Sequence, residues 1–177
     1  MDADNLSRWG RRLLRERLHK RDKETALSLG PIQLEKLLPH RGPALLVDRV
    51  EAVDRQGQTL RAVRTLVATD RGFEGHFPGE PVYPGVLQIE AMGQAALCLF
   101  HLVRSGFAFV PDAKPDAIRL TRVMQATFVS ALRPGDTVSL EAHVVELDDM
   151  LSTAATQLYR GDELCAAALL EVYRADS

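Results

Sequence analysis

Cysteine and long hydrophobic runs are both scarce in this chain of 177 residues. Its two cysteines, Cys98 and Cys165, lie inside apolar stretches without a C-x-x-C spacing, so a fold held by disulfides is excluded and two buried thiols are expected. The longest unbroken apolar run, residues 95–100, is far shorter than the ~20 residues that cross a membrane. No apolar segment follows the acidic start, so no signal peptide is expected. These absences predict a cytoplasmic protein without a membrane span.

Motifs for nucleotides, metals and serine hydrolysis are also missing. The sequence has no G-x-G-x-x-G or Walker pattern, no G-x-S-x-G elbow and no H-E-x-x-H pair. Apart from His76, treated below, the histidines are scattered along the chain: His19, His40, His101 and His143. We therefore expect neither metal-binding nor cofactor-binding residues.

Charge is distributed unevenly, although the net charge is only −2. Residues 1–24 carry eight Arg or Lys against five Asp or Glu, whereas the rest of the chain is acidic. One helix is too little for a helix-turn-helix, so no nucleic acid is expected as a partner. The segment docks on the body through its apolar residues, guides an acidic partner protein, or contacts an acidic surface such as that of a membrane. Helical spacing predicts one basic amphipathic helix over residues 5–24, within an N-terminal arm of residues 1–30, from Leu6, Trp9, Leu13, Leu14 and Leu18.

The remaining residues, 31–177, alternate between helix and strand patterns. The long helix is apolar on nearly all sides, so it should be buried on nearly every side. A sheet wrapped around one central helix achieves this burial, which predicts an α+β fold with a curved antiparallel sheet. The expected elements are a short helix at 32–38, a hairpin of strands 44–53 and 59–67, the long helix at about 85–105, and strands at 117–129, 136–147, 151–160 and 163–173.

The passage from residue 75 to residue 94 carries the chemistry. It places His76 in a turn with three prolines and Glu90 in an apolar helix fourteen residues later. Imidazole ordinarily titrates near ~6.5 and can act as a base, while burial of Glu90 can keep it protonated as an acid. Gln94, four residues on, lies on the same helical face and can orient that carboxyl. The N–H groups of Gly85 and Val86, at the helix start, can hold a thioester carbonyl and its developing negative charge.

Each of these residues also has a plainer interpretation. A histidine after glycine in a turn is often a surface or capping residue. Glu90 can form a structural salt bridge with Arg104 or Arg122, since a buried carboxylate needs a partner. Gly85 can be a turn glycine only, and Gln94 can simply face a partner subunit.

The string from Gly75 to Gln94 closely resembles the signature of the β-hydroxyacyl-acyl-carrier-protein dehydratases of fatty acid synthesis, in the FabZ-type branch whose acid residue is glutamate. Residues 37–41, 45–50, 128 and 132–136 match further segments, so the resemblance spans about residues 32–173. It implies a hotdog domain over residues 31–177. It also implies dehydration of 3-hydroxyacyl-acyl-carrier-protein thioesters to trans-2-enoyl thioesters, in fatty acid or a related polyketide- or polyene-like biosynthesis.

The same resemblance implies the site and the partners. His76 and Glu90 receive the catalytic roles and meet across a dimer interface, while His40 has a structural role beside the entrance. Acyl carrier protein is the partner, its phosphopantetheine arm carries the substrate without a further cofactor, and the assembly is a homodimer or a trimer of dimers. The residues implied to bind the substrate are Gly85, Val86, Gln94, Phe77 and Tyr83.

The chain departs from the family pattern in three places. Tyr83 stands where the family usually has Met or another apolar residue, and Gln88 stands where Ile or Leu is usual. Both lie near the catalytic pair, which favours a short, branched, aromatic or oxygenated acyl chain as substrate. Residues 125–129 lack basic residues that the family often shows, so the basic arm could steer an acidic carrier protein instead.

Other functions fit the same fold. An acyl thioesterase would hydrolyse acyl-CoA with an activated water and would need no paired His and Glu at this spacing. A non-catalytic acyl-binding regulator would need a DNA-binding head, which one short helix does not supply. Isomerisation of the enoyl product usually accompanies Asp at the acid position, so Glu90 disfavours it.

Overall fold

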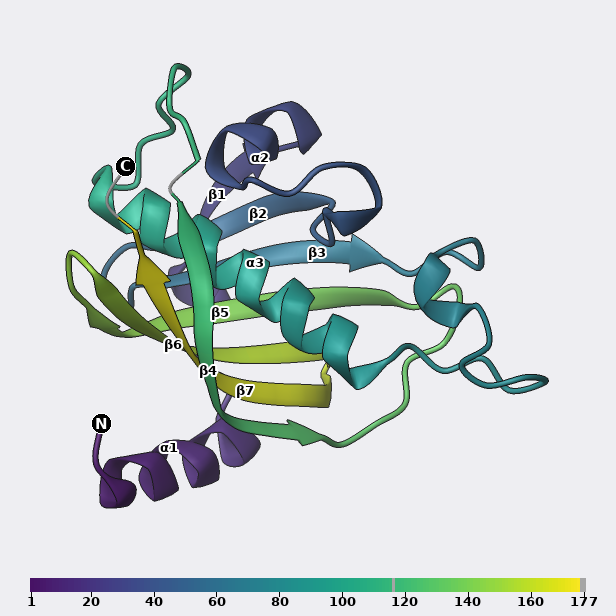
Figure 1. Cartoon of the computed structure of the whole chain (residues 1–177). Coiled ribbons are helices and arrows are strands. Elements are labelled where there is room, and N and C mark those ends of the chain that lie inside the picture. Colours follow the sequence, from purple (N-terminus) through teal and green to yellow (C-terminus); the bar gives the residue numbers. More distant parts are fainter. Residues whose placement is uncertain (116, 176–177) are drawn as a thin grey trace.

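Seven antiparallel strands form one curved sheet in the computed structural model, which describes residues 1–115 and 117–175 (Figure 1). Across the sheet the strands follow the order β1-β2-β3-β5-β6-β7-β4. Their bounds are β1 Thr25–Leu29, β2 Arg49–Asp54, β3 Thr59–Thr65, β4 Ile118–Phe128, β5 Thr137–Leu147, β6 Leu151–Arg160 and β7 Glu163–Arg174. The described helices are α1 Ala3–Arg15, α2 Pro31–Leu37 and α3 Gly85–Arg104, with short 3-10 turns η1 Arg21–Lys23, η2 Gly42–Ala44 and η3 Arg71–Phe73.

The long helix α3 lies against one face of the sheet, the inner face, and packs on β3, β5, β6 and β7 (Figure 1). Met92, Ala95, Leu99 and Phe100 have no solvent-exposed surface, because the helix and sheet bury them as the main core. By length and composition α3 could cross a membrane, but 61% of that stretch is buried inside the fold. The expected α+β fold, a curved antiparallel sheet around one central helix, is confirmed.

The opposite face of the sheet, the outer face, is covered by α1. Leu13 and Leu18 are buried there, with Trp9 partly buried beside them. Most of β6 is therefore buried on both of its faces. The arm thus docks on the body through its apolar stripe, which was the first of the alternatives expected for it. The outer cluster comprises Leu13, Leu18, Ala155, Ala167 and Leu169, flanked by Leu6, Trp9, Met124, Val145 and Leu164.

A buried glutamine on β6 decides where α1 ends. Gln157 Nε2 donates to the carbonyls of Leu13 and Glu16, at 2.7 Å each, and Gln157 Oε1 accepts from the Leu18 N–H at 2.9 Å. Those carbonyls would otherwise accept from the next helical turn. α1 therefore ends at Arg15, and the expected helix over residues 5–24 is wrong beyond that point.

Charged side chains hold the rest of the arm segment. Arg17 donates from Nε to the buried carboxylate of Glu141 at 2.9 Å. His19, itself buried, lies 2.8 Å from Glu24, and Arg61 donates to the same carboxylate at 2.9 Å. The Arg61 hydrogen bond, assisted by His19, lowers the pKa of Glu24 to about 2. These pairs attach residues 16–24 to the outer face.

Two expected strands differ from the structure. Residues 25–29 form β1 and pair with β2, so the sheet begins inside the segment assigned to the arm. The strand expected at 44–53 begins only at Arg49. Backbone groups of the preceding residues are hydrogen-bonded to a side chain of α3 instead of to a neighbouring strand. Gln94 donates to the Ala44 carbonyl and accepts from the Leu46 N–H, both at 2.7 Å. The other expected helices and strands are confirmed to within a few residues, and Cys98 and Cys165 are buried free thiols, as expected.

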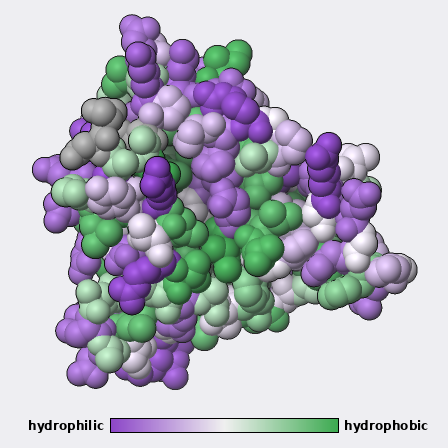
Figure 2. Space-filling view, in the orientation of Figure 1, coloured by the Kyte–Doolittle hydropathy of each residue, from purple (hydrophilic) through white to green (hydrophobic). Residues whose placement is uncertain are grey.

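The β4 edge of the sheet is poorly covered within the single chain. β4 is the last strand in the sheet order, and most of its residues are exposed or half-buried. Figure 2 shows apolar side chains gathered over α3 and β4 on the face that it presents. We call the exposed apolar residues of this region the β4 patch: Val86, Leu120, Val123, Phe128 and Val129.

Candidate active site

The proline-rich turn before α3 fixes His76. Gly75 and Gly79 have φ angles of 77° and 80°, in the left-handed region that residues with side chains rarely adopt. His76 Nδ1 donates to the Val82 carbonyl across 2.8 Å. This hydrogen bond leaves Nε2 as the ring nitrogen with a lone pair, which is the form that can accept a proton.

A pocket of about 520 Å³ lies beside His76 at the start of α3. Gly85 and Val86 line it, and their N–H groups belong to the first helical turn, where no acceptor exists within the helix. A Cβ atom on residue 85 would lie 2.8 Å from the ring of Phe128, so only glycine allows this close approach. The pocket therefore combines a potential base with donors for an oxygen that gains negative charge.

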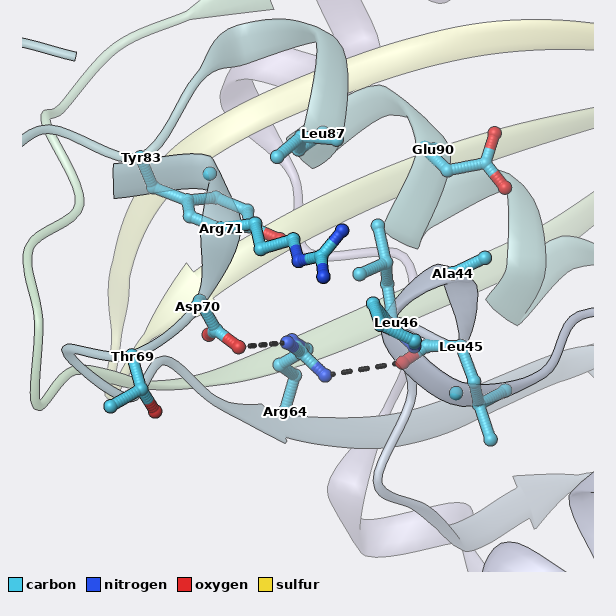
Figure 3. A pocket seen from close by; sticks show the side chains of 13 residues that line it. Ala44, Leu45, Leu46, Arg64, Thr69, Asp70, Arg71, Tyr83, Leu87 and Glu90 are labelled. Carbon is cyan, nitrogen blue, oxygen red and sulfur yellow. Dashed lines mark hydrogen bonds and ion pairs between the residues drawn. The ribbon is translucent and has the colours of Figure 1, made fainter. Parts of the chain in front are cut away.

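Glu90 is among the residues that line a second pocket, of about 620 Å³ (Figure 3). Its side chain is 41% exposed in the single chain. Gln94 Nε2 donates to Glu90 Oε1 across 2.8 Å, and His40 Nε2 lies 3.2 Å from the same oxygen. The hydrogen bond with His40, assisted by Gln94, holds the pKa of Glu90 below its ordinary value against the effect of partial burial. The expectation that burial keeps Glu90 protonated is therefore wrong for the single chain.

His40 contacts Glu90 directly, a role that the sequence did not predict. It lies between α2 and η2, and its Nδ1 is buried without a hydrogen-bond partner among the described residues. The two salt bridges considered for Glu90 are not formed: Arg104 donates to the Asp148 carbonyl, and Arg122 lies 3.9 Å from Glu171. The matched segment at residues 37–41 was the available signal, but it did not say which carboxylate His40 would meet.

Within one chain, His76 and Glu90 line different pockets. Tyr83, only 2% exposed, lines both. Phe77 lines neither of the two; it is exposed, and its ring stacks on His76 with 4.2 Å between the ring centroids. The structure brings Gly85 and Val86 to His76, and Gln94 to Glu90, and leaves the two halves apart.

The side chains present suit acid–base chemistry. Over residues 1–115 and 117–175, no three His, Cys, Asp or Glu side chains gather as a metal site would require. A histidine with a free ring nitrogen, a carboxyl group and helix N–H donors can together move protons and stabilise an enolate.

Comparisons with known proteins agree with this chemistry. The family model of the FabA-like domain matches residues 38–168. The 3-hydroxyacyl-[acyl-carrier-protein] dehydratase FabZ of Nitratiruptor sp. is 34% identical over 84% of this chain and 99% of its own length. The FabZ of Variovorax paradoxus is 37% identical over 82% and 94%, respectively.

Among solved structures, the dehydratase heterocomplex ApeI:P from Xenorhabdus doucetiae aligns with a TM-score of 0.62 at 16% identity, over 81% of this chain and 91% of that one. At that identity the alignment shows a shared fold. The family match covers most of the chain, and the curated relatives are similar along nearly their whole length. The chain therefore belongs to the FabA-like family, among dehydratases of the FabZ type.

Proposed function

We propose that this chain removes water from 3-hydroxyacyl groups carried on acyl carrier protein, giving trans-2-enoyl thioesters for fatty acid biosynthesis. The names of its FabZ relatives state this activity. The observation that carries the proposal is the His76 pocket, where an imidazole with a free Nε2 lies beside the N–H groups at the start of α3.

The chemistry follows from these groups. His76 Nε2 takes the proton from C2 of the substrate, and the electron pair moves into the thioester carbonyl to give an enolate. The N–H groups of Gly85 and Val86 stabilise the enolate oxygen. When the carbonyl re-forms, C2 and C3 become doubly bonded and the C3 hydroxyl leaves as water with a proton from Glu90. The Val82 carbonyl supports the imidazolium as it forms, because Nδ1–H already donates to it.

Glu90 must be protonated to act as this acid. In the single chain the hydrogen bond with His40 lowers the pKa of Glu90, and partial burial opposes it. A second chain that covers the exposed part of the side chain would strengthen desolvation, which disfavours the charged form and raises the pKa. We infer that the acid form of Glu90 belongs to the assembled enzyme.

A homodimer would also unite the two half-sites. β4 forms an edge of the sheet, and an edge strand offers unpaired backbone groups to another chain. The β4 patch lies along this edge and at the start of α3, next to the His76 pocket, to which Val86 and Phe128 belong. We propose that two copies join there, alone or within a trimer of dimers, with His76 of one chain facing Glu90 of the partner subunit.

The proposed reaction calls for no cofactor beyond the phosphopantetheine arm of the carrier, since the chain supplies the base, the acid and the donors for the enolate. We place the enzyme in the cytoplasm, where acyl carrier protein would be its partner.

Hydration of a trans-2-enoyl thioester, followed as loss of the conjugated enoyl absorbance, tests the proposal in the reverse direction. Activity should fall by ~10²-fold or more in both His76→Ala and Glu90→Gln, with circular dichroism unchanged. A wild-type protein that is inactive on carrier-linked and CoA-linked chains of several lengths would refute the function. Activity that survives both substitutions would refute the mechanism alone.

A further inference from the structure

The Glu90 pocket carries polar groups that a plain hydrocarbon chain would not use. We propose that it selects acyl chains bearing a second, uncharged oxygen beyond C3, a hydroxyl or a carbonyl, which accepts a hydrogen bond from the Tyr83 hydroxyl beside Arg64. This inference rests on the proposed function and names its substrate class.

The first observation is a buried hydroxyl whose hydrogen has no acceptor. The Tyr83 hydroxyl and Arg64 Nε are both buried, and neither makes a hydrogen bond of ordinary geometry with the described residues. The other nitrogens of Arg64 are engaged: one donates to Asp70 at 2.9 Å and the other to the Leu45 carbonyl at 3.3 Å (Figure 3). Buried polar groups in native proteins are nearly always paired, so an unpaired hydroxyl in a residue that lines a pocket indicates a bound group.

The two groups lie next to each other. Burial raises the pKa of the Tyr83 hydroxyl above its ordinary value, while the charge of the neighbouring Arg64 and a weak hydrogen bond between the two side chains oppose that rise. The Tyr83 oxygen can accept from Arg64, and its hydroxyl, protonated at neutral pH, keeps a hydrogen without an acceptor. An oxygen of the substrate can accept that hydrogen, and a methylene cannot.

The charges nearby favour an uncharged oxygen. Arg64 is already paired with Asp70 at 2.9 Å and lies 3.5 Å from Asp48. Arg71 adds a positive charge to the pocket lining, and Glu90 adds a negative one. In Figure 3 the Arg71 side chain extends from η3 into the pocket, in front of the Tyr83 ring. With the charges of the lining balanced, a carboxylate gains no net attraction there.

The fold holds Tyr83 firmly in place. Its N–H donates to the Leu132 carbonyl at 2.8 Å, and its carbonyl accepts from Gln88 Nε2 at 3.0 Å. Gly72 makes room for the ring, since a Cβ atom there would lie 3.2 Å from Tyr83 Cε2 and 2.5 Å from Leu87 Cδ1. The two residues that depart from the family pattern, Tyr83 and Gln88, thus act together: one offers the hydroxyl, and the other fixes its backbone.

The same pocket connects this polar end to the reacting carbons. Leu46 and Leu87 provide apolar wall between Glu90 and Tyr83. These side chains separate Glu90 from Tyr83, so the second oxygen should lie further along the acyl chain than C3.

The test uses pairs of enoyl thioesters of equal chain length, one saturated beyond the double bond and one with a hydroxyl or keto group moved stepwise along the chain. The full-length wild type should prefer at least one oxygenated chain by ten-fold or more in kcat/KM, about 1.4 kcal/mol. Tyr83→Phe, which removes only the hydroxyl, should reduce that preference at least ten-fold. Gln88→Leu should reduce it as well. Tyr159→Phe, on a buried tyrosine that contacts Arg17, should preserve it.

The outcomes separate the two proposals. If no thioester is turned over, the proposed function fails. If saturated chains are turned over as well as every oxygenated one, this inference fails and the function stands. A preference that survives Tyr83→Phe, or one confined to chains ending in a carboxylate, would overturn the assignment to the Tyr83 hydroxyl.

Discussion

His40 Nε2 lies 3.2 Å from Glu90 Oε1, although the two residues are separated by fifty positions and come from different elements. The contact joins the segment after α2 to α3 and gives the proposed acid a partner that favours its ionised form. Gln94 is hydrogen-bonded to Glu90 and also to the backbone of Ala44 and Leu46. It therefore fixes the position of Glu90 relative to the segment that carries His40.

Replacing His40 should change the pH dependence of the reaction. Because the hydrogen bond with His40 lowers the pKa of Glu90, His40→Ala should raise that pKa. A required acid is lost as pH rises through its pKa, so the alkaline limb of the kcat/KM profile should move to higher pH. The measurement is the pH profile of wild type and variant. His101→Ala, on a histidine that lines neither pocket, is the control. A shift to lower pH would contradict this account.

Two inactive variants should restore each other if the site is shared between subunits. In a dimer of His76→Ala with Glu90→Gln chains, one of the two sites keeps both intact groups. Equal mixing after unfolding and refolding should therefore recover about a quarter of wild-type activity. Analytical ultracentrifugation would establish the dimer in parallel. Refolded mixtures that remain inactive would rule out a shared site.

The docking of α1 should be measurable as stability. Leu13 is 2% exposed in the outer cluster, whereas its neighbour Leu14 is 45% exposed. Leu13→Ala should lower the free energy of unfolding by about 2–4 kcal/mol, as deletion of a buried leucine side chain does. Leu14→Ala is the matched control and should change it by less than about 0.5 kcal/mol. Urea unfolding compares the two, and equal losses would show that α1 is not docked in solution.

Glu24 should contribute to resistance against acid. Its pKa falls from an ordinary 4.5 to about 2, chiefly through the hydrogen bond with Arg61. A lowered pKa stabilises the fold above the unfolded value, so the contribution is full above about pH 4.5 and is lost as pH falls toward about 2. It amounts to at most about 3 kcal/mol. Glu24→Gln should flatten the decline of unfolding free energy across that window; an unchanged decline would locate the acid sensitivity elsewhere.

The exposed arginines of α1 provide a test of carrier steering. Neutralising Arg11 and Arg15 should raise the KM for carrier-linked substrate several-fold at low salt, since surface charge governs encounter with an acidic partner. Small thioester surrogates should react as before. Arg55→Gln, an exposed cation outside the arm, serves as the control. Equal effects on both kinds of substrate would argue against steering. Deleting the arm is a poorer test, because it strips the partners from Glu141 and Gln157.

The sequence was sufficient for the elements whose pattern is local. α3 was predictable because it is apolar on nearly all sides and starts directly after Pro84, and the strands from β4 to β7 are separated by turn residues such as Pro134 and Gly135. β1 was missed because it is short and follows a helical pattern that continues to Leu18. Only Gln157, far along the chain, stops that helix.

The candidate site divides in the same way. The turn around His76 and the face shared by Glu90 and Gln94 follow from local spacing, and the structure bears out their local geometry. The pairing of Glu90 with His40 depends on tertiary packing, as does the buried Tyr83 hydroxyl without an acceptor. No pattern along the sequence reports which groups of a folded chain remain without a partner.

The hydrogen bonds between Gln157 and the arm have a consequence for folding during translation. Translation proceeds from α1 toward β7, yet the bonds from Gln157 to Leu13, Glu16 and Leu18 span 139 to 144 positions. The apolar stripe of α1 therefore leaves the ribosome long before β6 and β7 exist to cover it, and it stays open to chaperones or to aggregation in the interval. The segment made first is among the last to reach its place, so a docked arm marks a chain whose final strands have already paired.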